Sequence, residues 1–332
     1  MKAGWFALVA SVAVLAGTMT TSTARTPPSV SDAAVLDGTP RNLSEYGFFI
    51  DLKRHDPARG VVPYELNTPL YSDGADKLRF LYVPDGAKVT ADGDGLLQFP
   101  VGSAIIKTFA FGEGTDRTLI ETRVLLHRAD GWVALPYRWN AEQTDAMLAL
   151  AGGRLPVTRP DGSEISYRIP NKNQCKTCHS KDGEVIPIGP KLRNLSAADL
   201  ERFGVAARSG NALPVWGDRA DYAADKVARG YLDVNCAHCH QPGGSASNSG
   251  LDLRWEQDDP HAIGIRKPPV AAGRGAGGHK VSIAPAEPDN SILLYRMRST
   301  EAGVAMPELG RDTADPEGVE AVRKWIEGMP AS

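Results

Sequence analysis

Every cysteine of this 332-residue chain belongs to one of two copies of the string Cys-x-x-Cys-His. Two thiols separated by two residues can form thioether bonds with the two vinyl groups of one haem. The histidine that follows is then held beneath the iron as its proximal ligand. Because no cysteine is left over, the sequence predicts two covalently attached c-type haems. The residues of the two motifs are Cys175, Cys178 and His179, and Cys236, Cys239 and His240.

Two other kinds of site use pairs of cysteines with this spacing. One pair can be a redox-active disulfide, and two pairs can together hold a structural zinc ion. Neither of these sites gives a reason for a histidine to follow directly after both pairs. Haem attachment explains the whole motif in both copies, so it is the preferred interpretation.

The N-terminus has the pattern of a secretory signal over residues 1–24. Lys2 supplies a short positive region, an apolar run follows over residues 5–17, and residues 22–24 offer a small-x-small cleavage site. The alternative is a single membrane anchor, but the run is shorter than the roughly 20 residues that span a bilayer. We therefore expect cleavage near Ala24 and a periplasmic protein with no membrane span in its mature chain.

The charge balance bears on the kind of partner. The chain has 37 Lys and Arg residues against 40 Asp and Glu residues, a formal net charge of −3. A nucleic-acid partner would favour a basic face, so this balance argues against one. The 34 glycines and 24 prolines predict many turns, and the length predicts two or three domains.

Between residues 41 and 170 the sequence predicts an antiparallel β-rich domain, either a sandwich or a barrel. A mobile polar linker is expected before it, over residues 25–40. Short stretches of alternating, β-branched or aromatic residues are separated by turns rich in Gly and Asp. One helix, capped by Asn140, is expected to end near Leu150, and a hairpin is expected to turn at residues 160–162. The predicted strands are 78–83, 96–100, 103–111, 118–127 and 132–139.

From residue 171 onward the sequence changes to loops and short helices. Residues 171–218 form the first haem-binding segment, with one helix over 196–203 capped by Ser196. Residues 219–332 form a separate domain, with helices over 219–240, 291–298 and 316–328. The glycines of residues 273–278 match the spacing of a dinucleotide-binding loop. They lack a preceding strand and a following helix, so a flexible loop is expected there.

The C-terminal region resembles a class I cytochrome c domain, in which a helix, the haem motif, a long loop, a helix, a Met-Pro pair and a terminal helix follow in order. Gly230, Tyr231 and Trp325 resemble the residues at which the first and last helices of that family cross. The resemblance implies that Met306, followed by Pro307, is the sixth ligand of the second haem, a ligation that raises the reduction potential. The alternatives are Met329, His261 and His279, whereas Met297 is expected to pack in a helix core.

More broadly, the chain resembles uncharacterised exported dihaem c-type cytochromes that have a β-rich N-terminal domain. The stretches that carry this resemblance are 66–73, 120–123, 137–140, 143–146, 231–240 and 288–296. It implies a multidomain α+β fold, an antiparallel β-rich domain followed by a mostly α-helical cytochrome c-like region with two covalent haems. It also implies periplasmic electron transfer, and it supplies no substrate.

The first motif lacks an evident sixth ligand, because residues 180–237 contain no methionine or histidine. Residues 188–192 resemble the Gly-Pro-x-Leu loop that packs beside the proximal ligand in class I cytochromes. Three possibilities remain open: a ligand from the β-rich domain, a nearby lysine or tyrosine, or an open iron. The side chains considered are His55, expected to be solvated, His127, expected at a strand edge, Met147, expected on an apolar helix face, and Lys181 and Lys191.

Two functions follow, from different classes. The leading expectation is an electron carrier that exchanges electrons with a periplasmic redox partner such as a dehydrogenase or an oxidase. The alternative is a dihaem peroxidase-like enzyme whose first haem is an open catalytic site. A third possibility is a binding module in which the β-rich domain docks a partner and the haems act as a relay. No catalytic side chain is predicted.

Overall fold

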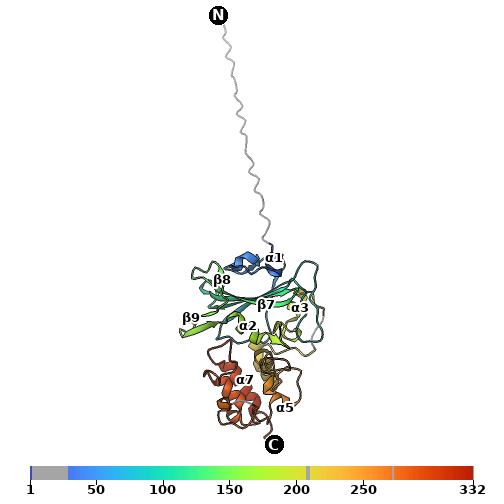
Figure 1. Ribbon diagram of the computed structural model, residues 1–332, viewed down its shortest axis with the longest axis vertical. Helices are drawn as coiled ribbons and strands as arrows, with labels where there is room; N and C mark the ends of the chain where they lie inside the picture. Colours follow the sequence, from blue (N-terminus) through green and yellow to red (C-terminus); the bar gives the residue numbers. More distant parts are fainter. Residues whose placement is uncertain (2–28, 207–209, 271–272, 332) are drawn as a thin grey trace.

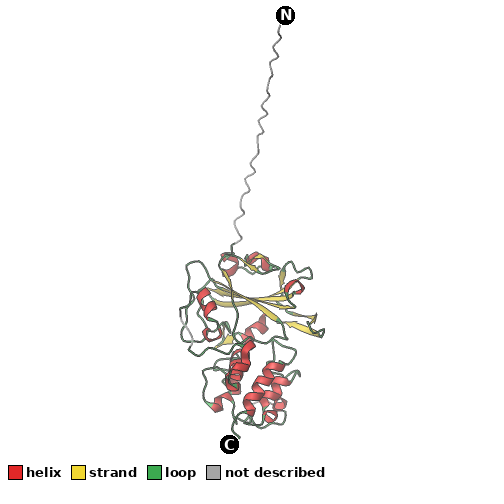
Figure 2. Cartoon of the chain, turned by 180° about the vertical axis from the view of Figure 1, so that it is seen from behind, coloured by secondary structure: helices red, strands yellow, loops and turns green. Residues whose placement is uncertain are grey.

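The computed structural model describes Met1 and residues 29–206, 210–270 and 273–331. The predicted secretory signal, with its cleavage site near Ala24, therefore lies outside the described residues apart from Met1. The chain contains both helices and antiparallel sheets, which confirms the α+β class. The strands lie in one half of the molecule and most of the helices in the other (Figure 1, Figure 2).

One six-stranded antiparallel sheet forms the frame of the N-terminal half. Each strand pairs with the strand before it in the chain, so the sheet is an open meander and the predicted sandwich or barrel is wrong. Short turns join β5 to β6, β6 to β7 and β7 to β8, whereas longer loops over residues 64–75 and 83–103 join β3 to β4 and β4 to β5. Its strands are β3 (Val61–Pro63), β4 (Asp76–Tyr82), β5 (Ala104–Phe111), β6 (Thr118–Arg128), β7 (Gly131–Trp139) and β8 (Ala146–Leu148).

Three small hairpins accompany this sheet. They pair β1 (Phe49–Asp51) with β2 (Asp56–Pro57), β9 (Gly153–Thr158) with β10 (Glu164–Ile169), and β11 (Ser180–Lys181) with β12 (Glu184–Val185). The turn of the β9–β10 hairpin contains Asp161, as the sequence predicted. Its carboxylate accepts hydrogen bonds from the backbone N–H and hydroxyl of Ser163, at 2.9 and 2.6 Å.

The two faces of the sheet bury different parts of the chain, because successive side chains of a strand point to opposite faces. One face packs against the N-terminal segment, which includes helix α1 (Asp32–Leu36) and the 3-10 turn η1 (Leu43–Tyr46). Val35 and Tyr46 are fully buried there, so the described part of the predicted linker, from residue 29 on, belongs to the core. The other face packs against residues 175–205, including helices α2 (Lys172–Cys178) and α3 (Ala197–Arg202).

Four further helices form the C-terminal half. They are α4 (Ala224–Asn235), α5 (Pro260–Ile263), α6 (Ile292–Arg298) and α7 (Pro316–Glu327). Apolar residues of α4, α6 and α7, among them Leu232, Leu294 and Ile326, form a single core. Gly318 lies directly against the ring of Tyr231, so that a Cβ atom at this position would overlap the ring. This glycine sets how closely α4 and α7 approach.

Polar side chains join the two halves. The carboxylate of Asp73 accepts hydrogen bonds from the backbone N–H groups of Asp312 and Thr313 and from the Thr313 hydroxyl, all at 2.8 Å. Asp233 of α4 pairs with Lys191 at 2.8 Å and with Arg193 at 3.0 Å. These are charge-assisted contacts with little exposure of Asp73 or Asp233, so they fix the two halves against each other.

The helix predictions fared differently on the two sides of residue 171. Helices α3, α6 and α7 begin within a residue of their predicted starts, after Ser196, Ser291 and Asp315. The predicted helix over residues 141–150 is wrong, since that segment forms a turn and strand β8. Residues 96–100 make only isolated bridges and no strand. Among the described residues, no helix is both long and apolar enough to cross a membrane.

Candidate functional site

The first Cys-x-x-Cys-His motif is held by the short helix α2. Asn171 caps this helix, accepting from the N–H of Gln174 at 2.8 Å, while Gln174 accepts from the N–H of Asn171 at 3.0 Å. The helix ends at Cys178, and Cys175 is buried against the sheet. The motif is therefore built into the layer that covers one face of the sheet.

His179 follows the helix with its ring fixed in one tautomer. Its Nδ1 atom lies 2.9 Å from the carbonyl oxygen of Ile186. A carbonyl oxygen can only accept, so Nδ1 carries the proton and Nε2 keeps its lone pair. Burial lowers the pKa of His179 to about 3, which keeps the ring neutral. A neutral imidazole with a free Nε2 is the form that binds a metal.

The histidine of the second motif is held in the same tautomer as His179, by different hydrogen-bond partners. His240 places Nδ1 at 3.0 Å from the hydroxyl of Ser249, and that hydroxyl donates to the carbonyl of Ala246 at 2.7 Å. Since the single hydroxyl proton is used, Ser249 accepts from His240 and Nε2 is again left free. Burial lowers the pKa of His240 to about 4.

The two motifs lie against each other although 57 residues separate Cys178 from Cys236 in the sequence. The thiols of Cys178 and Cys239 are in hydrogen-bonding contact, and Cys239 ionises first because contacts with Cys178 and His238 lower its pKa. The backbone after the motifs also meets, since the N–H of Asp182 donates to the carbonyl of Gly243 at 2.9 Å. Tertiary structure thus brings two distant attachment sites together.

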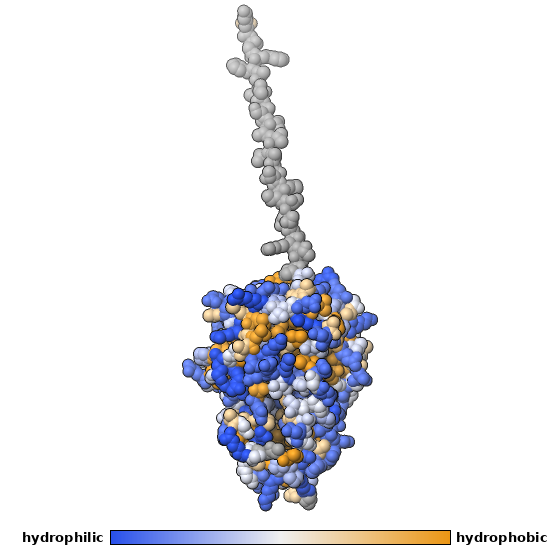
Figure 3. Space-filling model, in the orientation of Figure 1, coloured by the Kyte–Doolittle hydropathy of each residue, from blue (hydrophilic) through white to orange (hydrophobic). Residues whose placement is uncertain are grey.

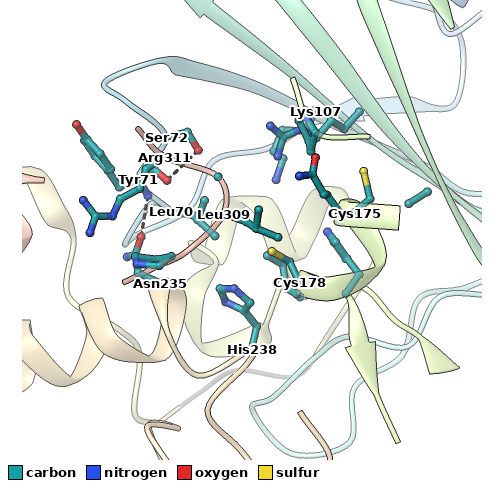
Figure 4. A pocket seen from close by; sticks show the side chains of 18 of the residues that line it. Leu70, Tyr71, Ser72, Lys107, Cys175, Cys178, Asn235, His238, Leu309 and Arg311 are labelled. Atoms are coloured by element: carbon teal, nitrogen blue, oxygen red, sulfur yellow. Dashed lines mark hydrogen bonds between the residues drawn. The ribbon is translucent and has the colours of Figure 1, made fainter. Parts of the chain in front are cut away.

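A cavity opens beside the first motif, with about 840 Å³ of space counted out to its mouth. Strands β5 to β7 form one wall and the C-terminal half forms the other. Figure 4 shows Lys107 and Cys175 on the sheet side, with Asn235 and His238 across from them. Leu309 and Arg311 of the segment after Met306 also line it.

A second cavity, of about 700 Å³, adjoins the first. The side chains shared by the two cavities include His179, Lys107 and Leu125, so the two cavities adjoin each other at the histidine of the first motif. The cysteines line only the first cavity, whereas Lys77, Arg79 and Lys191 line only the second. The combined space therefore runs from the attachment thiols toward basic side chains.

Four basic residues of the sheet face these cavities: Lys77, Arg79, Lys107 and Arg123. They are here called the basic cluster. Sequence reasoning missed them, although Lys77 and Arg79 alternate within a strand that is otherwise apolar. Burial, together with the neighbouring cations, lowers the pKa of Lys77 and of Lys107 to about 7. A carboxylate placed beside these amines would favour their charged form again.

Met306, the predicted sixth ligand of the second haem, is half-buried in the segment between α6 and α7. Its backbone N–H donates to the carbonyl of Arg296 at 3.0 Å, and the Arg296 side chain is an electrostatic neighbour of His240. The peptide bond between Met306 and Pro307 is cis. The structure therefore places the backbone of Met306 against the backbone of Arg296, whose side-chain charge also acts on His240.

The alternatives to Met306 lie elsewhere. Met297 is buried in the core of the helical half, as predicted, and Met329 packs at the edge of the same core. His261 is exposed at the start of α5, and the ring of His279 packs edge-on against Tyr295 at 5.4 Å. On the face seen in Figure 3 the surface is hollowed within the helical half of the molecule.

The side chains considered for the first haem are dispersed. His55 is buried, contrary to expectation, and its Nε2 lies 2.8 Å from the hydroxyl of Thr108 in the core on the far face of the sheet. His127 bonds the carbonyl of Phe99 at 2.8 Å and stacks on Trp132. Met147 is exposed on strand β8, so its expected place in a core is wrong. None of these three lines either cavity.

Closer candidates come from residues that the sequence argument set aside or did not weigh. His238 lines the first cavity, and its buried Nδ1 has no hydrogen-bond partner among the described residues. Lys107 lines both cavities from strand β5. Lys191 lines the second cavity and is held by Asp233, whereas Lys181 lines neither. No local sequence signal could place His238 or Lys107 beside His179, because both approach it through tertiary contacts.

Within the described residues, no three His, Cys, Asp or Glu side chains gather as they would around a metal ion. A structural zinc site requires four such ligands, so the shared four-cysteine site has no support in this geometry. A porphyrin supplies four ligands to its own iron, so the chain needs to add only one or two. One oriented histidine at each motif meets that requirement.

Comparison with known proteins found no matching family model, no matching curated protein and no matching solved structure.

Proposed function

We propose that this chain is a periplasmic dihaem c-type cytochrome that passes electrons to or from a redox partner. One observation carries the proposal: both motifs present a histidine whose Nδ1 is occupied and whose Nε2 is free, directly beside two unpaired thiols. A redox disulfide or a four-cysteine zinc site gives these two histidines no role. Haem attachment uses both of them as iron ligands.

In this proposal Cys175 and Cys178 hold one haem and Cys236 and Cys239 hold the other, with His179 and His240 as proximal ligands. The haem supplies one-electron chemistry when it is bound. The chain's own residues fix the imidazole tautomers and bury the Cys175 thiol against the sheet. They also line a cavity beside the first motif.

The contact between the motifs supports electron transfer as the task. Because the Cys178 and Cys239 thiols touch, two groups attached there would be neighbours, and an electron could enter at one and leave at the other. A protein with a single redox centre would not need the backbone pairing of residues 181–182 with 243–244. The arrangement suits a short internal relay.

The C-terminal half supports a cytochrome c-like arrangement around the second site. Helices α4 and α7 cross at Tyr231 and Gly318, and the motif follows directly from α4. Met306 is the proposed sixth ligand, which would make the second haem the centre of higher potential. Export through the signal at residues 1–24 is part of the same proposal, since haem c is attached outside the inner membrane.

The test is haem content by site. The full chain, expressed with an export and haem-attachment pathway, should gain the mass of two haems. The variant Cys175→Ser/Cys178→Ser should lose one, and Cys236→Ser/Cys239→Ser should lose the other, with the remaining haem still redox-active. Denaturing mass spectrometry and a redox titration give these readings. A wild-type protein of unmodified mass would overturn the proposal.

A second function, a peroxidase-like enzyme, is favoured by one specific observation. His179 lines both cavities, so an incoming small molecule has space next to the first site. An open iron there would be high-spin, bind cyanide and consume peroxide. Two low-spin haems with no peroxide turnover would leave the carrier function alone.

A further inference from the structure

Within the basic cluster, like charges lie at directly opposed positions of neighbouring strands, an arrangement that destabilises a sheet. Arg79 of β4 lies directly opposite Lys107 of β5, and Lys107 lies directly opposite Arg123 of β6. Like charges at directly opposed positions destabilise a sheet. The repulsion among these three cations would be offset by negative charge on the same face of the sheet.

The chain supplies only part of that negative charge. Arg123 forms a two-pronged pair with the fully buried carboxylate of Glu121, at 2.5 and 2.9 Å. Arg79 pairs with Glu65 at 3.0 Å, and this glutamate is 75% exposed. Four basic residues therefore meet two carboxylates on this face, and the two lysines are left without an acidic partner among the described residues.

Lys77 and Lys107 share one place on the sheet. Their Nζ atoms lie 5.8 and 5.2 Å from the centroid of the Phe109 ring, so the two amines flank the same aromatic side chain. Lys77 donates only to the carbonyl of Ala75. Two amines held close together in an enclosed space, both short of an anion, form a site for a ligand with two carboxylates.

The position of this site relative to the thiols identifies the ligand. Lys107 lines both cavities, while Lys77 and Arg79 line the second cavity, away from Cys175 and Cys178. A haem joined to those thiols and set over His179 carries its two propionate carboxylates on the edge remote from the thioether bonds. Lys77 and Arg79 line the cavity that this edge would reach, and Lys107 lines both that cavity and the one that contains the thiols.

We propose that Lys77 and Lys107, assisted by Arg79, bind the propionate carboxylates of the first haem. The inference rests on the proposed function, because it requires a haem at Cys175 and Cys178. It assigns the sheet a specific task. In this proposal the sheet of the N-terminal half neutralises the carboxylates of the haem. The thiols that attach the haem and its proximal histidine lie on and directly after helix α2, which packs against that sheet.

The experiment compares the exported dihaem protein with Lys77→Gln, Lys107→Gln and the double variant. Lys88→Gln, which removes an exposed lysine of the same half, is the matched control. Resonance Raman spectra report the deformation modes of the propionates, and a potentiometric titration reports both midpoint potentials. We expect altered propionate modes and a negative shift of the first haem's potential, because a cation that favours the reduced iron is lost. The control should match wild type.

Conservative replacement separates charge from structure. Lys107→Arg keeps the cation, so it should retain the wild-type potential and propionate modes where Lys107→Gln does not. If all the lysine variants carry two haems with unchanged modes and potentials, the inference is overturned while the proposed function stands. A change of spin state in Lys107→Gln and Lys107→Arg alike would instead assign Lys107 as an iron ligand and overturn its role here. A wild-type chain without haem would overturn the proposed function itself.

Discussion

The two Cys-x-x-Cys-His motifs are alike in sequence, but different parts of the structure surround them. The first lies between a sheet and a helical half, and its cavity is lined by residues from widely separated parts of the chain. The second follows from α4 within the helical half. Each histidine is oriented by a residue less than ten positions away, Ile186 for His179 and Ser249 for His240, so the motifs differ in their surroundings and not in this contact. A motif set in local structure depends on its neighbours in sequence, whereas a motif at a junction depends on the whole fold.

The largest effect is expected from a substitution that disturbs the helical half alone, because only the second motif lies within that half. Gly318→Val should place a side chain inside the ring of Tyr231 and separate α7 from α4. Overpacking of a core typically costs about 1–3 kcal/mol, and a buried ring as the obstacle places the expected loss at the upper end of that range. Urea unfolding followed by circular dichroism measures the loss, and the second haem should become labile before the first.

Gly217→Val is the matched control for that variant. Gly217 is exposed, and a Cβ at this position would meet nothing within 4 Å. It should unfold within about 0.5 kcal/mol of wild type, as most surface substitutions do. Equal losses from the two variants would mean that the α4–α7 contact does not limit stability.

The stability of the sheet half is expected to depend on pH through the buried His55. Burial lowers the pKa of His55 to about 4, below the value near 6.5 of an unfolded histidine. Between these values the unfolded chain binds more protons than the folded chain, so stability is full above about pH 6.5 and falls as the pH drops toward 4. The loss should total about 3 kcal/mol.

Unfolding at several pH values measures this slope, and His55→Asn should flatten it. Asparagine tolerates the left-handed backbone that His55 adopts, at φ 56°, and does not titrate. The variant should be less stable throughout, since it loses ring packing. Replacing the exposed His261 with glutamine should leave the slope as it is in wild type. A wild-type slope in His55→Asn would remove His55 as its source.

The junction itself is tested by Asp73→Asn. This change keeps the size of the side chain and its left-handed backbone, at φ 53°, but removes the charge that accepts bonds from the backbone of residues 312 and 313. Hydrogen bonds to a charged group contribute about 1.5–3 kcal/mol, so a loss of about 2 kcal/mol is expected. Thermal unfolding should separate into two transitions, and a single unchanged transition would contradict the role of Asp73.

The smallest effect should come from Ser249→Ala. The first histidine donates to a backbone carbonyl that no substitution removes, whereas the second donates to a side chain. Loss of that acceptor should cost about 1 kcal/mol and shift the potential of the second haem only. Ser247→Ala, two residues away in the same 3-10 turn, is the control. Equal shifts at both haems would mean that Ser249 does not act through His240.

The sequence by itself determined what depends on neighbours along the chain. The motifs, their histidines, the cap at Ser196 and the β9–β10 hairpin follow from residues a few positions apart. A cap or a turn is satisfied locally by backbone hydrogen bonds. The helix expected at residues 141–150 failed because pairing with β7 overrides local helix preference.

Only the tertiary structure decided what depends on strand register and packing. Register places Arg79, Lys107 and Arg123 in line, although 44 residues separate the first from the last. Packing brings Cys178 to Cys239 and buries His55 behind the sheet, away from both cavities. Distant segments pair because the fold buries their apolar faces together. The spacing of these charged and sulfur-bearing residues in the sequence does not predict which of them will meet.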